Sequence, residues 1–229
     1  MSMARQAKTW LREHRRFGRV YARAASSWLN LRVVSYQFFR GRYHSASRFD
    51  SVFRAQVDPW NYNSDLVAQA RRDLILAAVP AVAGRALEIG CAEGFITKRL
   101  ARQCRELLAV DISAVAVSRA RLACLSLTNV QFEVLDLQCE PLPGAFDTIL
   151  CAGVLVYLEA VDQARVSATI TNALAEDGIL ILEHTQRAFP GEQAGRDIHA
   201  LYMSQPSLRT LSHAEVGIYA ITVLKKSIT

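Results

Sequence analysis

From residue 84 onward, short apolar runs alternate with segments whose apolar residues recur at helical spacing. The runs RALEIG, ELLAVDI, VQFEVLD, FDTILCAG and GILILEHT are each predicted to be a strand. Helices are predicted between them over residues 95–104, 114–125 and 162–175. Strands that are apolar along their length and alternate with helices are typical of a parallel sheet covered on both faces.

Two further strand-like runs follow in the tail SLRTLSHAEVGIYAITVLKK, with no helix between them. The predicted fold is therefore α/β: a Rossmann-like, doubly wound, mostly parallel seven-stranded sheet with an antiparallel closing strand. Ahead of the first strand, FDSVFRAQVDPWNYNSD is rich in aromatic and turn residues and is predicted to be a loop that crosses the surface. Ser64 and Asp65 then form a predicted N-cap for a helix that ends before Pro80.

Charge is concentrated at the start of the chain. Residues 1–42 hold ten Lys or Arg and one acid, Glu13, a net charge of +9, so the remaining residues carry −3 of the formal +6. Apolar residues between Trp10 and Trp28 recur every three or four positions, which predicts a basic amphipathic helix. Such a helix suits an anionic membrane surface or another acidic partner, and a helix packed on its own domain or a transit peptide are the alternatives. We therefore divide the chain into a basic, partly amphipathic N-terminal extension (1–48) and a domain over 49–229.

Composition narrows the class of protein. A hydrophobic fraction of 51% with 21% charged residues is that of a globular chain, and no apolar run approaches the roughly 18 residues of a membrane span. No secretory signal follows the first methionine. The five cysteines contain no CxxC, so neither a metal site nor a disulfide framework is expected. We expect a cytoplasmic protein, with contact to the membrane periphery as the alternative that the basic helix suggests.

The stretch ALEIGCAEGFIT joins the first predicted strand to a helix, which is a common ligand-binding turn. A dinucleotide fingerprint G-x-G-x-x-G would start at Gly90, but Ala92 and Phe95 stand where its second and third glycines belong. What remains is E-x-G-x-x-x-G, formed by Glu88, Gly90 and Gly94. This pattern favours a ligand without a diphosphate.

Two more carboxylates end the next strands. Asp111 closes LLAVDI, where a carboxylate can accept hydrogen bonds from both hydroxyls of a ribose. Asp136 ends EVLD, where an adenine amino group can be recognised. These positions indicate a nucleoside, and both NAD and S-adenosylmethionine contain one.

Taken in order, ALEIGCAEGFIT, AVDIS, EVLDLQ and FDTILCAGVLVYL resemble the successive motifs of class I S-adenosylmethionine-dependent methyltransferases. Together with DPWNY and the C-terminal tail, they make residues 49–229 similar to the small nodulation-protein-S-type enzymes, which N-methylate an amino-sugar oligosaccharide. The chain departs from that pattern at Ala92, where many relatives have glycine, and at Gly153, where relatives often have an acid.

The resemblance implies S-adenosylmethionine as cofactor and S-adenosylhomocysteine as product. It implies that Glu88 meets the methionine amino group, that Asp111 holds the ribose, and that Arg71 anchors the methionine carboxylate. The full set of implied cofactor residues is Arg71, Glu88, Gly90, Cys91, Gly94, Asp111, Ile112, Asp136, Leu137 and Cys151.

The acceptor side is less determined by the pattern. His184, directly after ILILE, is a candidate general base because the ordinary histidine pKa suits that role, and Tyr157 is a second catalytic candidate. Methyl transfer to nitrogen can also proceed with proton loss to water and no base. Trp60 and Tyr62 are expected to close over the donor, and His199 and Tyr202 to lie on a lid helix.

The function that these features favour is transfer of a methyl group to N or O of a small molecule, with a sugar or amino-sugar metabolite as the leading candidate. The alternatives are a catalytically silent S-adenosylmethionine-binding protein that acts through its basic arm, and a nicotinamide-dependent oxidoreductase. Nucleic acid is disfavoured as a partner because the domain is slightly acidic and shows no basic, aromatic-lined path. Oligomeric state is open.

Overall fold

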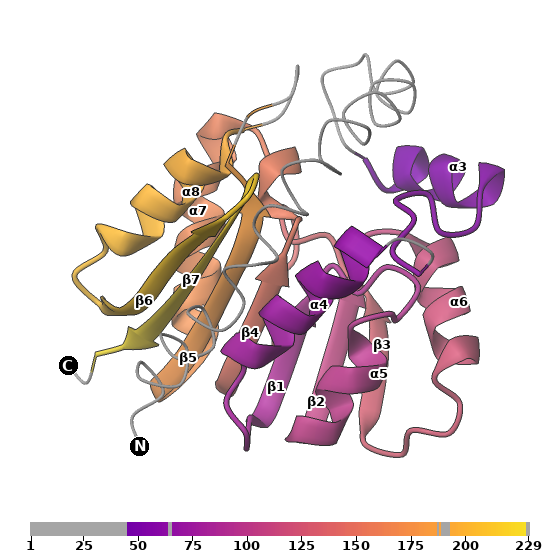
Figure 1. Ribbon diagram of the computed structural model, residues 1–229, viewed down its shortest axis with the longest axis horizontal. Coiled ribbons are helices and arrows are strands. Elements are labelled where there is room, and N and C mark those ends of the chain that lie inside the picture. The colour runs from indigo at the N-terminus through magenta and orange to yellow at the C-terminus, as the bar shows by residue number, and fades with distance from the viewer. Residues whose placement is uncertain (1–44, 64–65, 187, 189–192, 228–229) are drawn as a thin grey trace.

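The computed structural model describes residues 45–63, 66–186, 188 and 193–227. The predicted N-terminal amphipathic helix and the Ser64–Asp65 cap lie outside these residues. The predicted boundary at 48/49 falls within a helix that spans Ala46–Ala55, and the division into an extension and a domain stays a prediction. Figure 1 shows one twisted sheet with helices on both sides.

The sheet has seven strands in the order β3-β2-β1-β4-β5-β7-β6. β1 to β5 run parallel to one another, and β7 is antiparallel to both β5 and β6. The predicted fold class is therefore confirmed, including the antiparallel closing pair. The strands are β1 (Gly84–Ile89), β2 (Cys104–Asp111), β3 (Val130–Val134), β4 (Phe146–Ala152), β5 (Leu174–Thr185), β6 (Leu208–Val216) and β7 (Tyr219–Lys226).

Helices α4 to α6 cover one face of the sheet, and α7 and α8 cover the other (Figure 1). Alternate strand residues feed the two apolar layers: Leu87 packs toward α7 and α8, while Ala86 and Leu107 pack with Ile75 of α4. The helices are α3 (Ala46–Ala55), α4 (Leu66–Ala78), α5 (Thr97–Leu100), α6 (Ala114–Ala123), α7 (Ala160–Ala173) and α8 (Gly195–Met203), with the 3-10 turns η2 (Ala101–Gln103) and η3 (Leu155–Tyr157).

Two predicted segments differ from the structure. The segment expected to be a surface loop begins with helix α3, because Phe49 and Phe53 are four residues apart and bury the same side of the helix. The helix predicted over 95–104 is shorter, because residues up to Ile96 belong to the turn after β1 and the chain tightens into η2 before β2 begins at Cys104.

Candidate functional site

A large cavity lies beyond the carboxyl ends of β1, β2 and β4, where the strand order reverses between β1 and β4. This is where ligands bind in open α/β sheets. The cavity measures about 800 Å³ including its open mouth, which is within the usual size of a small-molecule site. Its walls are Phe49, Phe53, Trp60, Tyr62, Ile89, Gly90, Ala92, Val110, Asp111, Ile112, Leu135, Asp136, Leu137, Gln138, Ala152, Gly153, Val154, Tyr157 and Leu158.

The turn after β1 needs its first glycine. Gly90 has φ +82°, and a Cβ atom there would lie 2.2 Å from the Val154 side chain. Its N–H donates to the Val110 carbonyl of β2 at 2.8 Å, which holds the turn against the neighbouring strand. Ala92, at the predicted departure from the glycine pattern, also has a left-handed φ of +47°. Alanine therefore fits in space but adopts a backbone conformation that glycine adopts more readily.

Asp111 faces the large cavity and also closes this turn. One carboxylate oxygen accepts the Ala92 N–H at 2.9 Å and the other accepts the Ser113 N–H at 2.9 Å. Burial raises the pKa of Asp111, and the Ser113 and Ala92 N–H groups counteract that rise. Each oxygen keeps acceptor capacity for a ligand hydroxyl, since a carboxylate has about four lone-pair sites.

The far wall of the cavity carries the predicted adenine-edge residues. Ile112, Asp136 and Leu137 all line it. Asp136 also caps a local turn, because its side chain accepts the Gln138 N–H at 2.9 Å. The structure thus brings these three residues together with Asp111 along one wall.

A second, smaller cavity of about 370 Å³ adjoins the first and shares Tyr62, Gly90, Ala92 and Ala152 with it. Glu88 lies in its wall and is buried, and its carboxylate accepts the Thr97 hydroxyl at 2.6 Å. Burial raises the pKa of Glu88 to about 7; the Thr97 hydrogen bond lowers it, and the nearby Asp111 raises it further. Cys91 lines the same cavity, and burial raises the pKa of its thiol.

Two arginines of α4 also line the smaller cavity, and they differ in their partners. Arg71 is buried against Glu183 with Nε–Oε1 and Nη2–Oε2 distances of 2.8 and 2.5 Å. Arg72 has a buried Nη1 with no hydrogen-bond partner among the described residues. Burial lowers the pKa of Arg72, as expected for a guanidinium without a counterion in contact. Arg71 was predicted from the sequence as a cofactor residue, and Arg72, the neighbour with the open donor, was not.

An aromatic cover closes the other side of the large cavity. Trp60 and Tyr62, both predicted, stack with ring centroids 6.2 Å apart. Phe53 of α3 meets Trp60 edge-on at 5.3 Å, and Phe49 meets Tyr157 of η3 at 5.4 Å. The two phenylalanines were missed, although their spacing of four residues was a usable signal.

The aromatic cover is attached to the glycine turn by Glu93, which the sequence analysis did not single out. This buried carboxylate accepts the Asp58 N–H at 2.8 Å and pairs with Arg119 of α6 at 2.8 Å. Asp58 in turn accepts the N–H groups of Tyr62 and Asn63 at 2.7 and 2.8 Å.

The prediction of His184 as general base is corrected by the structure. Its ring is fully buried and does not line either cavity. Nε2 accepts the Leu155 N–H at 3.2 Å, so the neutral ring carries its proton on Nδ1 and donates to His199 Nε2 at 3.1 Å. Burial, followed by the His199 and Arg71 charges, lowers the pKa of His184 well below its ordinary value. A ring without access to the site cannot take a proton from an acceptor.

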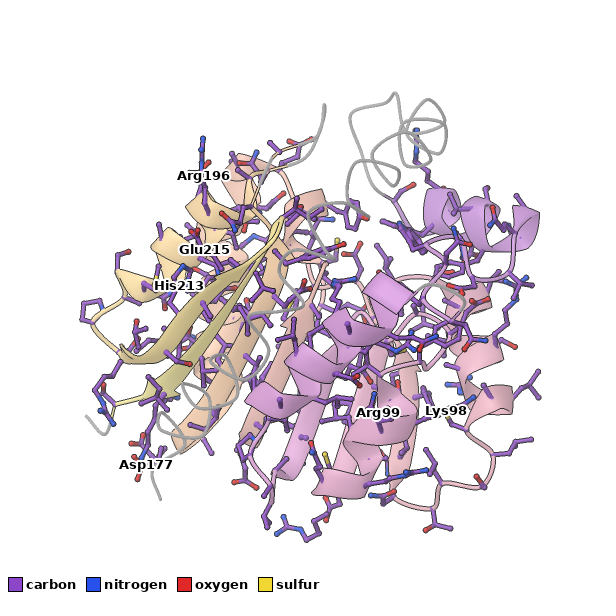
Figure 2. The ribbon with its side chains drawn as sticks, viewed as in Figure 1. Lys98, Arg99, Asp177, Arg196, His213 and Glu215 are labelled. Carbon is purple, nitrogen blue, oxygen red and sulfur yellow. The ribbon has the colours of Figure 1, made fainter. Side chains whose placement is uncertain are left out.

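The hydrogen-bond chain continues outward from this pair. His199 Nδ1 donates to Thr222 Oγ1 at 2.6 Å, and Thr222 Oγ1 is hydrogen-bonded to His213 Nδ1 at 2.7 Å. Burial lowers the pKa of His199 to about 4. His213 and Glu215 lie on β6 at the outer edge of the sheet (Figure 2). This series of hydrogen bonds therefore links β5, α8, β7 and β6 structurally.

Four other predicted residues also lie away from the two cavities. His199 and Tyr202 sit on α8, which packs against the sheet and is not a lid, because both side chains are fully buried in the core. Cys151 ends β4 but its side chain points into the core between the sheet and α7. Gly94 packs against α6, where a Cβ would lie 3.0 Å from the Cys124 sulfur. Of the catalytic candidates, only Tyr157 lines the large cavity.

The surroundings of Gly153 account for the glycine at a position where relatives often have an acid. It has φ +68°, and a Cβ there would lie 3.0 Å from Nη2 of Arg71. Its N–H donates to the Glu183 carbonyl at 2.7 Å. A side chain at this position would compete for the space that the Arg71 guanidinium occupies.

Among the described residues, no three His, Cys, Asp or Glu side chains gather in a way that would hold a metal ion. None of the described helices is both long enough and apolar enough to cross a bilayer.

Comparison with known proteins finds relatives of this chain. Nodulation protein S of Sinorhizobium fredii is 31% identical over 130 residues, which cover 56% of this chain and 60% of that protein. The chain thus spans less than two thirds of the curated relative's length. A ubiquinone biosynthesis O-methyltransferase of Xanthomonas campestris is 30% identical over 121 residues, covering 51% of this chain and 49% of that protein.

Among solved structures, the fold matches the N-methyltransferase NodS of Bradyrhizobium japonicum, solved with S-adenosyl-L-homocysteine. The TM-score is 0.70 at 21% identity, covering 77% of this chain and 96% of that one. A family model described as nodulation protein S (NodS) matches residues 52–210, well over half of the chain and the whole of the described cavity wall from Phe53 to Leu158. The chain therefore belongs to the nodulation protein S family.

Proposed function

We propose that this protein is an S-adenosylmethionine-dependent methyltransferase that acts on a nitrogen or oxygen atom of a small molecule. The observation that carries the proposal is the joined pair of cavities at the carboxyl ends of the strands. The large one presents Asp111 and Asp136 to a nucleoside, and the small one presents an acid, Glu88, and an open basic donor, Arg72 Nη1. A nucleoside joined to a zwitterionic amino acid has the charges and the shape that this arrangement fits.

Each part of S-adenosylmethionine would be bound by a different group of cavity residues. Glu88 would accept hydrogen bonds from the ammonium group and Arg72 would donate to the carboxylate, with the carboxylate of Asp111 accepting from the ribose hydroxyls. Ile112 and Leu137 offer apolar surface to the base, and Asp136 offers an acceptor to an exocyclic amine. When bound, the sulfonium supplies an activated methyl group, so the protein has to orient the reactants and exclude water.

The acceptor would enter under the aromatic cover. Trp60, Tyr62 and Tyr157 line the large cavity, and Tyr62 lines the small one as well. With His184 buried, the described cavity wall offers no histidine, and an amine acceptor would lose its proton to water. Aromatic faces accept sugar rings as well as planar rings, and family membership makes an amino sugar the first acceptor to test.

The setting of the protein is proposed on two observations. All five cysteines are free thiols, which suits the reducing cytoplasm. The net +9 of residues 1–42 suits contact with an anionic membrane surface or another acidic partner.

The test begins with calorimetric titration of the purified full chain with S-adenosylmethionine, S-adenosylhomocysteine and NAD. Micromolar affinity for the two adenosyl ligands and none for NAD is expected. Incubation with S-adenosylmethionine and chitosan oligosaccharides, followed by mass spectrometry, then checks for transfer of one methyl group, with a simple catechol as a comparison acceptor. Binding of NAD alone would overturn the proposal, and binding without any methylated product would favour the silent binding protein.

A further inference from the structure

We infer that Glu93 is a positioning residue that holds the aromatic cover over the junction of the two cavities. The effect of Glu93 on donor binding rests on the proposed function, whereas its structural effect concerns residues 56–63 alone. No ligand role is assigned to Glu93 itself, and it does not line either cavity.

The position of Glu93 in the chain is the first step. It lies in the turn after β1, next to Ala92, whose atoms line both cavities. Its side chain is buried, with 6% of its surface exposed. A buried carboxylate is costly unless each oxygen is paired, so the partners of its two oxygens indicate what the residue is kept for.

Each oxygen has a different partner. Oε1 pairs with Nη1 of Arg119 at 2.8 Å, which anchors Glu93 to α6. Oε2 accepts the backbone N–H of Asp58 at 2.8 Å, a residue 35 positions earlier in the chain. Glu93 therefore connects the glycine turn, α6 and the segment that follows α3.

Asp58 is in turn hydrogen-bonded to the segment that carries the aromatic residues. It has a left-handed φ of +50°, and its carboxylate accepts the N–H groups of Tyr62 and Asn63. These bonds close a tight turn with Trp60 at its centre, and Asn61 also has a left-handed φ, of +53°. Two non-glycine residues in this conformation persist only when surrounding contacts hold them, and the Glu93 bond is one of the contacts that reach this segment, beside the Tyr62–Phe95 ring contact and the Arg119 bond to the Gln56 carbonyl.

The position of this turn beside the cavities explains why the Glu93–Asp58 hydrogen bond would matter for donor binding. Tyr62 lines both cavities, and Trp60 stacks on it over the larger one. Tyr62 also contacts Phe95, two residues after Glu93, with ring centroids 6.2 Å apart. The cover thus lies over the wall that the two cavities share, where the amino-acid and nucleoside parts of the donor would join. Holding it there would retain the donor and exclude water from the reacting methyl group.

The test uses Glu93→Gln, which keeps the size of the side chain but has a single oxygen that can accept a hydrogen bond, in place of two. Glu106→Gln is the matched control, since Glu106 lies exposed near the start of β2. Amide hydrogen exchange is followed in the peptides covering 56–63 and 104–111 without ligand. Affinity for S-adenosylhomocysteine is measured by calorimetry, and Trp60 fluorescence is recorded in a Trp10→Phe/Trp28→Phe background.

We expect Glu93→Gln to exchange faster in 56–63 and at the control rate in 104–111, with a changed Trp60 emission. Its dissociation constant for S-adenosylhomocysteine should rise about tenfold, the scale of one lost charge-assisted hydrogen bond. Unchanged exchange in 56–63, or exchange that is faster in both peptides alike, would overturn the inference, the latter because it shows a general structural role. If the unmodified chain binds no adenosyl ligand, the proposed function fails, while the exchange comparison still decides whether Glu93 holds the turn.

Discussion

Arg71 of α4 and Glu183 of β5 form a two-pronged ion pair that is buried on both sides, although the two residues lie 112 positions apart in the chain. Burial alone would lower the pKa of Arg71, but the attraction of Glu183 outweighs it and raises the pKa well above its ordinary value. The guanidinium also lies over the rings of Tyr62 and Tyr219, at 5.5 and 4.9 Å from their centroids. Arg71 therefore supports the wall of the small cavity with its charge already neutralised, which leaves Arg72 as the open donor.

Removing one member of this pair should be costly. Glu183→Gln leaves a buried guanidinium without its counterion, and we expect a loss of about 3–5 kcal/mol in the free energy of unfolding. Urea denaturation followed by circular dichroism measures it. The control is Asp73→Asn, which breaks the half-exposed pair with Arg99 and should cost less than about 1 kcal/mol. The double variant Arg71→Leu/Glu183→Leu should recover much of the loss, and equal stability of Glu183→Gln and the unmodified chain would contradict the account.

Asp111 should matter for donor binding more than for folding. Asp111→Ala removes the acceptor for the ribose hydroxyls and the partner of the Ala92 N–H. Affinity for S-adenosylhomocysteine should fall by about 1–3 kcal/mol, the range for losing hydrogen bonds to a charged group. Calorimetry on the variant and on Asp147→Ala, an acid at the opposite end of the sheet beside Gly84, gives the comparison. Unchanged affinity in Asp111→Ala would sink the assignment of the nucleoside wall.

Glu88 should make stability fall as pH rises. Its folded pKa of about 7 lies above the ordinary value of 4.5, so between these two values the folded chain holds a proton that the unfolded chain has lost. Relative to Glu88→Gln, the unmodified chain should be equally stable below about pH 4.5 and less stable by up to about 3 kcal/mol above pH 7. The measurement is urea unfolding of both proteins at pH 4.5, 6 and 8. His199 has the opposite tendency, because its lowered pKa favours the folded state as pH rises toward 6.5, but it is present in both proteins and cancels in the difference.

His184 should prove structural. His184→Ala leaves the Leu155 N–H and His199 Nε2 without their partners and opens a cavity in the core. The expected loss is about 3–4 kcal/mol in the free energy of unfolding. His213→Ala, at the outer end of the same hydrogen-bond chain, should cost about 1 kcal/mol. A His184→Ala variant with unchanged stability and abolished turnover would restore the general-base role.

The sequence by itself determined the architecture and one wall of the site. Alternating apolar runs and helical spacing are local properties, and they predicted five parallel strands and the antiparallel pair after them. Gly90, Asp111 and Asp136 were found because strand ends of a parallel sheet meet at one edge, so their position along the chain fixes their place in the molecule.

The tertiary structure decided what a side chain is free to do. His184 lies near the end of a strand, as Asp111 does, yet α8 and β7 bury it, and no local sequence pattern predicts that packing. Arg71 and Arg72 are neighbours in the sequence, and only the arrival of Glu183 from β5 separates a neutralised charge from an open donor. In the sequence Glu93 is one polar residue of a turn, and only the fold brings Asp58 and Arg119 to its two carboxylate oxygens. Ionisation and access depend on groups brought together by folding, and these are distant in the sequence.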